Sequence, residues 1–158
     1  MTFIEKLKLS GAALLLALVP MSNATATKVD DSYVTNNRQI TCLTDNAYFE
    51  ARGQSTAGKY AVMHVVMNRA KDSRFPGTPC GVVYQRTGRT CQFSWVCSGS
   101  RRVRETGVYN ELQGMASRVY AGHVPDNTGG AKFFHSTRIN PGWVCRGAKI
   151  IGAHRFCR

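Results

Sequence analysis

Apolar residues recur at helical spacing in three stretches of the chain. The clearest stretch repeats apolar side chains every three or four positions, at Val108, Leu112, Met115, Ala116 and Val119. Side chains with this spacing lie on one face of a helix, and a glycine just beyond the last turn is a common helix stop. The pattern therefore predicts an amphipathic helix over about 108–119 that ends at Gly122.

An earlier stretch predicts a helix that is buried on most of its surface. Ser55 or Thr56 is a suitable N-terminal cap, and the segment from there to Ala70 is apolar around most of its circumference. A helix without a continuous polar face is expected in the interior of a domain. We therefore expect this segment to form the central helix.

A third helix is predicted immediately before the central one, over about 41–52, with a glycine as its stop. Leu43, Ala47 and Glu50 are spaced four and three residues apart, so they share one face of this helix. A carboxylate among apolar side chains costs free energy unless it is paired or its proton chemistry is used. Glu50 is therefore either an ion-paired residue, with Arg52 or a distant arginine as its partner, or a candidate catalytic acid.

The second half of the chain carries short strand patterns. Residues 131–135 are one strand candidate, and the β-branched residues between 143 and 157 allow one or two more. The segment 85–100 is expected to be an irregular loop or a small hairpin, because it is rich in Gly, Thr, Ser and aromatic residues. Helices followed by short strands, with no repeat or linker, indicate a single α+β domain.

The N-terminus has the pattern of an export signal. Two lysines precede a short apolar run over 11–19, and small residues follow at 24–26. This order is typical of a secretory signal peptide, and the run is shorter than the roughly 20 residues of a membrane span. We expect residues 1–26 to be removed and the mature protein to be secreted or periplasmic, with a retained membrane anchor as the alternative. Residues 27–40 are mostly polar and are expected to form a flexible lead-in.

All six cysteines lie in the mature part, which favours disulfide bonds in an exported protein. Cys91 can pair with Cys97, and Cys145 with Cys157, because the members of each pair are close in sequence; the connectivity itself stays open. A zinc site is the competing interpretation, but the sequence has no C-x2-C pair and its four histidines lack metal-ligand spacing. We expect disulfides, no metal and no cofactor.

The chain is strongly basic, with a formal net charge of +12. Without residues 1–26 it retains 19 Lys and Arg against 8 Asp and Glu, scattered along the sequence. In an exported protein this balance favours anionic partners such as cell-wall polymers, lipid surfaces or nucleic acid. Charge therefore narrows the class of partner without naming one.

Glu50 is the best candidate acid in the mature sequence. The other acidic residues belong to the lead-in, to loops, to the first turn of the 41–52 helix or to the polar side of the 108–119 helix. Only Glu50 combines an apolar helical face with a glycine stop just beyond it. Removal from water would raise the pKa of Glu50 and keep it protonated near neutrality, as a general acid requires.

Aromatic residues occur in three short segments, which are 92–95, 133–135 and 140–143, and the first and last of these also contain an amide, Gln92 and Asn140. Aromatic faces with nearby amides are what a sugar-binding groove uses, and they are equally what a hydrophobic core uses. Composition alone leaves both interpretations open and favours the core.

Several motifs, taken in order, resemble the SleB-type cell-wall hydrolases, the spore cortex-lytic enzyme family. The resemblance begins with Ala47-Tyr48-Phe49-Glu50-Ala51-Arg52-Gly53-Gln54 and continues through Asn68-Arg69, Arg74-Phe75-Pro76 and Val82-Val83-Tyr84-Gln85. It includes Gln92-Phe93-Ser94, Gly129-Gly130-Ala131, Phe133-Phe134 and the ending Ile151-Gly152-Ala153-His154-Arg155-Phe156-Cys157. It covers the chain from about Thr41 to the end, so we expect residues 41–158 to form the catalytic domain.

The resemblance implies a lysozyme-like α+β domain that acts on peptidoglycan glycan strands. The family's catalytic acid is the Glu of its E-A-R-G motif, which falls on Glu50. Substrate-binding residues are expected near the cleft at Tyr48, Gln92, Ser94, Phe133, Phe134 and His135. The chain departs from the common E-A-R-G-E pattern at Gln54, and an amide cannot act as a base.

One good carboxylate without a motif-matched second one favours a lytic transglycosylase, because hydrolysis by either common route uses two carboxylates. A hydrolytic muramidase is the alternative. A non-catalytic wall-binding module and a secreted basic nuclease are weaker candidates, and the sequence shows no metal-ligand cluster for a nuclease. We expect a monomer that binds peptidoglycan and the anionic wall surface, and does not bind nucleic acid.

Overall fold

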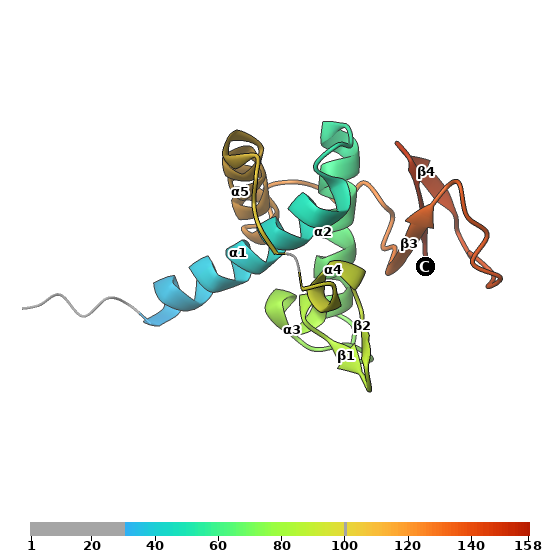
Figure 1. Ribbon diagram of the computed structural model, residues 1–158, viewed down its shortest axis with the longest axis horizontal. Coiled ribbons are helices and arrows are strands. Elements are labelled where there is room, and N and C mark those ends of the chain that lie inside the picture. Colours follow the sequence, from blue (N-terminus) through green and yellow to red (C-terminus); the bar gives the residue numbers. More distant parts are fainter. Residues whose placement is uncertain (1–30, 100) are drawn as a thin grey trace, which may run out of the picture.

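The structure is a computed structural model that describes residues 31–99 and 101–158. Its helices are α1 (Asp31–Ala51), α2 (Thr56–Ala70), α3 (Pro79–Val83), α4 (Ser94–Cys97) and α5 (Thr106–Tyr120). Its strands are β1 (Arg86–Thr87), β2 (Thr90–Cys91), β3 (Phe133–Ser136), β4 (Lys149–Ile151) and β5 (His154–Cys157). Figure 1 shows the helices gathered in one body and the last three strands beside it. The predicted helix-rich α+β class is confirmed.

The first helix begins ten residues earlier than expected. Residues 31–40 are helical, so the prediction of a flexible lead-in is wrong for this part of 27–40. Most of these residues are exposed, and Figure 1 shows this end of α1 projecting from the helical body. A helical turn with no face to bury leaves no apolar periodicity in the sequence, and extending a formed helix costs little. The predicted signal peptide and residues 27–30 lie outside the described residues.

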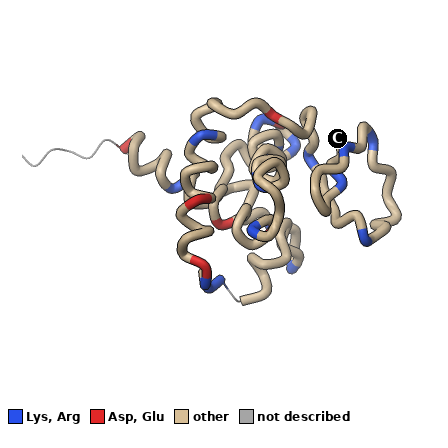
Figure 2. Tube along the Cα trace, turned by 90° about the horizontal axis from the view of Figure 1, so that it is seen from above, with Lys and Arg blue, Asp and Glu red and all other residues tan. Residues whose placement is uncertain are grey.

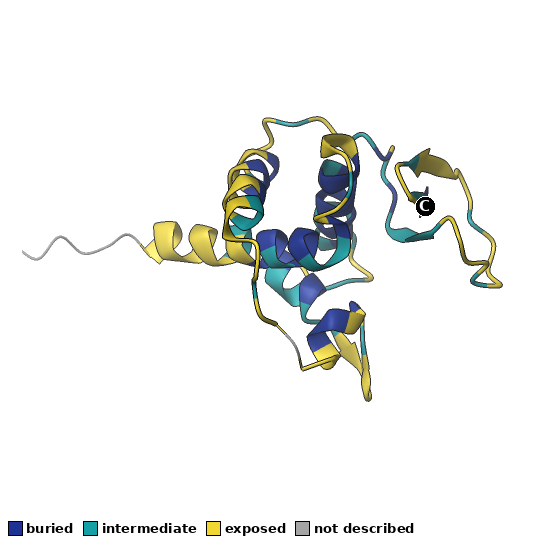
Figure 3. Ribbon diagram, turned by 45° about the horizontal axis from the view of Figure 1, so that its top comes forward, coloured by how far each residue is buried: buried dark blue, intermediate teal, exposed yellow. Residues whose placement is uncertain are grey.

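The predicted central helix is confirmed as α2, which packs against α1, α3 and α5. The Ser55 hydroxyl caps it by accepting a hydrogen bond from the backbone N–H of Gly58. Val62, Met63 and Val66 are fully buried within it. Figure 3 shows that buried residues concentrate where α1, α2 and α5 face one another. None of the described helices is both long and apolar enough to cross a membrane.

The C-terminal sheet has the antiparallel order β3-β5-β4. It packs on the helices through a small apolar cluster that joins Ala51 of α1, Val62 and Val65 of α2, Ala131 and Phe156. The expected small hairpin is also present, as β1 and β2, with Arg86 opposite Cys91.

Polar contacts from the end of α2 fix the start of this sheet. The Asn68 side chain donates to the carboxylate of Asp126 at 3.0 Å and to the Ala131 carbonyl at 3.1 Å. The Asp126 carboxylate in turn accepts from the backbone N–H groups of Thr128 and Gly130. This loop therefore enters β3 at a fixed place beside α2.

Three disulfides link the six cysteines. The two pairings suggested by closeness in sequence, Cys91–Cys97 and Cys145–Cys157, are confirmed. The third joins Cys42 of α1 to Cys80 of α3 across 38 residues. It holds the helix that carries Glu50 against a neighbouring helix.

Removing the Cys42–Cys80 disulfide is expected to destabilise the protein more than removing Cys91–Cys97. Closing loops of 38 and 6 residues predicts losses of about 4 and about 2 kcal/mol on loop entropy alone. Urea unfolding of the Cys42→Ala/Cys80→Ala and Cys91→Ala/Cys97→Ala variants measures both losses. Equal losses, or a larger loss for the short loop, would contradict this ranking.

Candidate active site

Glu50 lies in the last turn of α1 and lines a cavity of about 240 Å³. The other residues that line it come from α2, from the segment before α4, from α4 itself and from β3: Arg69, Gln92, Phe93, Ser94 and Phe134. The structure therefore brings Glu50 together with three of the predicted substrate-binding residues. Residues more than 80 positions apart in the sequence meet here because the sheet is packed on the end of α1.

The Glu50 carboxyl group is partly buried and has no partner among the described residues. The ion pair with Arg52 that sequence spacing allowed is not formed. Arg52 Nε instead pairs with Glu105 Oε2 at 3.0 Å, and its Nη1 donates to the Tyr48 carbonyl. Burial raises the pKa of Glu50 above the ordinary glutamate value. This shift favours the protonated form that a general acid needs.

The end of α1 is tied to the C-terminal sheet by Gln54. Its side-chain Oε1 accepts a hydrogen bond from the backbone N–H of Ala153, in the turn between β4 and β5, at 3.0 Å. The preceding residue, Gly152, has φ +61°, and a Cβ there would lie 2.7 Å from the Gln54 oxygen. A glycine is therefore required for this close approach. Gln54 does not line the Glu50 cavity, and its side-chain oxygen holds the turn at Ala153 beside the end of α1.

The segment that carries Gln92 and Ser94 is fixed against α1 by Trp95. The Trp95 ring stacks on Phe49, with centroids 4.6 Å apart and an interplanar angle of 20°. Its indole N–H donates to the buried Asn46 Oδ1 at 3.2 Å. The polar side chains beside Trp95 are thereby held at the mouth of the Glu50 cavity.

Arg69 is a cavity residue to which the sequence analysis gave no role. It is 3% exposed, and its guanidinium lies over the rings of Phe75, Phe93 and Phe133 at 5.3, 5.6 and 5.4 Å. Its Nε donates to the Lys132 carbonyl, whereas its buried Nη1 has no partner among the described residues. Burial lowers the pKa of Arg69 to about 10. The sequence does contain a signal for Arg69, because it is a basic residue in a helix that is predicted to be buried. Burying a cation without a charged partner costs free energy, so its presence indicates a specific role.

A second cavity, of about 470 Å³, adjoins the first. The two share Arg69, Gln92 and Phe134, and the second also includes Phe133 and Trp143. Phe133 thus lies next to the Glu50 cavity without lining it. Together the two cavities form one tract, which we call the cleft, with Glu50 at one end and Trp143 at the other.

Tyr48 and His135 lie outside the cleft. Tyr48 is 2% exposed, and its hydroxyl accepts hydrogen bonds from the backbone N–H groups of Arg104 and Glu105 at 3.0 and 3.2 Å. These contacts give Tyr48 a structural role beneath the start of α5. His135 lines a different cavity on the sheet, described below.

The other carboxylates of the described residues lie away from the cleft. Asp45 accepts hydrogen bonds from the hydroxyls of Tyr84 and Tyr109, and Glu111 pairs with Lys59. Asp72 pairs with Arg74, which holds the pKa of that carboxyl well below its usual range. None of the acidic residues other than Glu50 lines either cavity of the cleft.

One cluster in the described residues has the composition of a metal site. His135, Cys145 and Cys157 place their ligand atoms within 4.8 Å of one another. The two sulfurs are bonded to each other as a disulfide, so neither is available as a thiolate. The cluster therefore does not fit a metal ion.

The chain belongs to the cell wall hydrolase family, whose model matches residues 53–157. That match begins three residues after Glu50, whereas the similarity to individual relatives extends over 84% of the chain. The spore cortex-lytic enzyme of Halalkalibacterium halodurans is 30% identical over 137 residues, and that of Bacillus cereus is 26% identical over 140. The chain spans 38% and 48% of the lengths of these two relatives.

Two solved structures share the fold over their whole length. The catalytic domain of the Bacillus cereus SleB protein matches with a TM-score of 0.61 and 25% identity, covering 85% of this chain and 99% of that one. The catalytic domain of the germination-specific lytic transglycosylase SleB from Bacillus anthracis matches with a TM-score of 0.63 and 27% identity. This match covers 82% of the present chain and 100% of the Bacillus anthracis domain. The resemblance to the SleB family is confirmed.

Replacing Glu50 with Gln is expected to stabilise the protein at neutral pH. Because burial raises the pKa of folded Glu50, the unfolded chain loses this proton first as pH rises, and stability falls between the two pKa values. Glutamine does not ionise, so the variant avoids that loss. Urea unfolding at about pH 3 should show little difference between the proteins, and at about pH 7 the variant should be more stable.

The matched control is Glu105→Gln. Glu105 is exposed and ion-paired with Arg52, so this variant should gain no stability at either pH. Equal stability of the wild type and Glu50→Gln at neutral pH would contradict the burial argument.

Proposed function

We propose that the protein cleaves peptidoglycan glycan strands between N-acetylmuramic acid and N-acetylglucosamine, as a lytic transglycosylase that leaves 1,6-anhydro ends. Membership of the cell wall hydrolase family and the likeness to a SleB lytic transglycosylase support this activity. The export pattern of residues 1–26 supports a secreted or periplasmic location. We further propose that it acts as a monomer and that its basic surface favours the anionic wall.

The observation that carries the mechanism is the lone carboxylate of the cleft. Inverting and retaining glycosidases place two carboxyl groups on either side of the scissile bond, the second one activating water or attacking the sugar. Glu50 is the only carboxylate that lines the described part of the cleft. A reaction in which the substrate supplies the second nucleophile fits this arrangement.

Protonated Glu50 donates its proton to the glycosidic oxygen, and the bond from that oxygen to C1 of the muramic acid breaks. The Glu50 carboxylate then accepts the proton of the C6 hydroxyl of the same sugar. The C6 oxygen bonds to C1 and closes the anhydro ring, so the proton returns to Glu50 and no water is consumed. Gln92 and Ser94 offer an amide and a hydroxyl to the sugar, while Phe93 and Phe134 supply apolar walls.

Digestion of purified sacculi tests the activity, the mechanism and the role of Glu50 together. Wild-type protein should release anhydro-muropeptides, and Glu50→Gln should lower the rate at least about 100-fold with its fold intact. Glu105→Gln should retain the wild-type rate. Mass spectrometry of the products decides the mechanism, since products heavier by one water would establish the hydrolytic muramidase. Wild-type binding to sacculi without release of product would indicate a wall-binding module instead.

Gln54→Glu is expected to leave the product class unchanged. The sequence departure at this position raised the question of a missing base, but Gln54 lies outside the Glu50 cavity and holds the Ala153 turn. A glutamate there can still accept the Ala153 hydrogen bond. The variant should continue to release anhydro products, and the appearance of hydrated products would show that residue 54 takes part in the reaction.

A further inference from the structure

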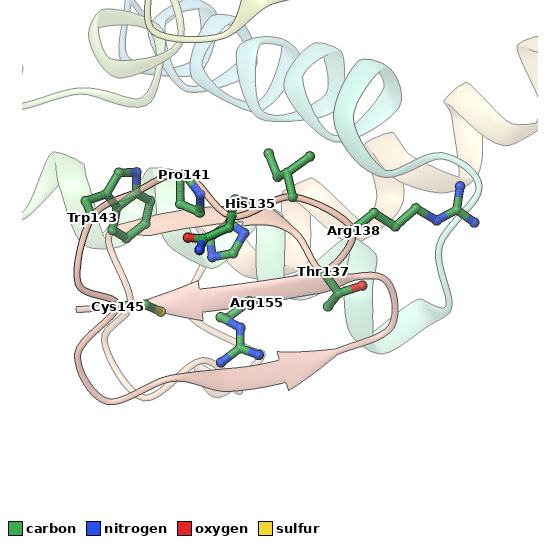
Figure 4. A pocket seen from close by; sticks show the side chains of 9 residues that line it. His135, Thr137, Arg138, Pro141, Trp143, Cys145 and Arg155 are labelled. Atoms are coloured by element: carbon green, nitrogen blue, oxygen red, sulfur yellow. The ribbon is translucent and has the colours of Figure 1, made fainter.

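A third cavity, of about 420 Å³, lies on the sheet beyond the cleft. Its wall is formed by β3, β5 and the loop between β3 and β4, and Figure 4 shows His135 and Arg155 on neighbouring strands with Trp143 and Pro141 nearby. His135 and Arg155 are paired across the antiparallel strands, so their side chains share one face of the sheet. We call this cavity the sheet pocket.

The sheet pocket is positively charged and has no internal counter-charge. Arg138 and Arg155 line it, and no Asp or Glu does. The sequence from 127 to 158 has six Lys and Arg residues and no acidic residue at all. Figure 2 shows this part of the fold carrying basic positions only.

Among the residues that line the sheet pocket, Arg155 is the best suited to bind an anion. Its side chain is half-buried, yet its guanidinium makes no hydrogen bond, ion pair or ring contact with any described residue. Arg155 stands on β5, the middle strand of the sheet, so its position is fixed. A planar guanidinium with free donors matches a carboxylate through two parallel hydrogen bonds.

Trp143 connects the sheet pocket to the cleft. It lines both the sheet pocket and the cleft cavity that contains Phe133 and Phe134. Its ring, 43% exposed, lies edge-on to Phe133 and His135 with centroids 6.1 and 5.4 Å away. A ligand in the cleft can therefore send a branch past Trp143 toward Arg155.

We propose that the sheet pocket binds a carboxylate of the stem peptide carried by the glycan strand, with Arg155 as its principal ligand. This inference rests on the proposed function, since a glycan strand in the cleft has the muramic acid peptide as its branch. It gives His135, predicted to contact substrate, a place beside the peptide rather than beside the scissile bond. The pocket would then make the enzyme select peptide-bearing over peptide-free strands.

The test compares glycan fragments with and without stem peptides, the latter prepared by amidase treatment. Equilibrium binding is measured on the Glu50→Gln protein, and kcat/KM on the wild type. Peptide-bearing fragments should bind about tenfold more tightly, the worth of one charge-assisted carboxylate contact. Arg155→Gln should remove this preference without changing binding of peptide-free fragments. Arg118→Gln, an equal charge change on the exposed side of α5, should leave the preference intact.

A second variant keeps the proposal testable if Arg155→Gln does not fold. Asn140 lines the sheet pocket from an exposed loop and accepts a hydrogen bond from Gly142, which an aspartate can also accept. Asn140→Asp should reduce the preference by placing a negative charge beside the incoming carboxylate.

Equal binding of peptide-bearing and peptide-free fragments by the Glu50→Gln protein, with Arg155 intact, would overturn the proposal. So would an Arg155→Gln effect that is the same on peptide-free fragments. A peptide preference abolished by inorganic phosphate at matched ionic strength would also overturn it, by showing a general anion site. Failure of the proposed function is a separate result, because it appears as the absence of anhydro products from the wild type whatever the binding data show.

Discussion

The packing of the C-terminal sheet on the end of α1 is the contact on which the site depends. Glu50 is on α1 and Phe134 is on β3, and only this packing closes a cavity between them. Three kinds of contact maintain it: the apolar cluster around Phe156, the Gln54–Ala153 hydrogen bond and the Asn68 contacts to the loop before β3. The apolar cluster supplies most of the free energy, whereas the hydrogen bonds fix the register of one part on the other.

The aromatic residues around the cleft pack against one another and against Arg69. Phe93 and Phe133 lie against the guanidinium of Arg69, which lets a cation stay buried without a carboxylate partner. Burying a neutral residue at this position would cost less free energy. Arg69 therefore keeps hydrogen-bond donors inside the cleft that a purely apolar wall would lack, and the cleft gains polarity without gaining a second acid.

Much of the helical body could be predicted from the sequence, because apolar periodicity reports burial. This periodicity predicted the central helix, the helix over 108–119 and the part of the first helix that carries Glu50. The start of α1 was missed because most of residues 31–40 are exposed and form no periodic apolar face. The Cys42–Cys80 disulfide, the Arg69 cluster and the Gln54 hydrogen bond were missed for a different reason: each joins segments that are distant in the sequence.

The residues predicted to bind substrate divide in the same way. Gln92, Ser94 and Phe134 line the Glu50 cavity. Tyr48 did not, because its hydroxyl is used by backbone donors at the start of α5. Neighbours in a strand point to opposite faces, so Phe134 reaches the Glu50 cavity, whereas Phe133 and His135 lie on the other face against Trp143. A motif fixes positions along the chain, but the face on which each side chain lies is set by the pairing of the strands.

The isolation of Glu50 also determines how its acidity is controlled. Where two carboxylates share a site, repulsion between their charges raises one pKa, and ionisation of one depends on the other. Here desolvation alone raises the pKa of Glu50, without a contribution from a neighbouring charge. In the proposed mechanism, a sugar that fills the cavity would exclude further water and raise the pKa of Glu50 further, so that the proton stays on Glu50 until the glycosidic oxygen takes it. The Glu50 carboxylate has no internal partner that would stabilise its charge, and in the proposed mechanism this favours its return to the protonated form by taking the C6 hydroxyl proton.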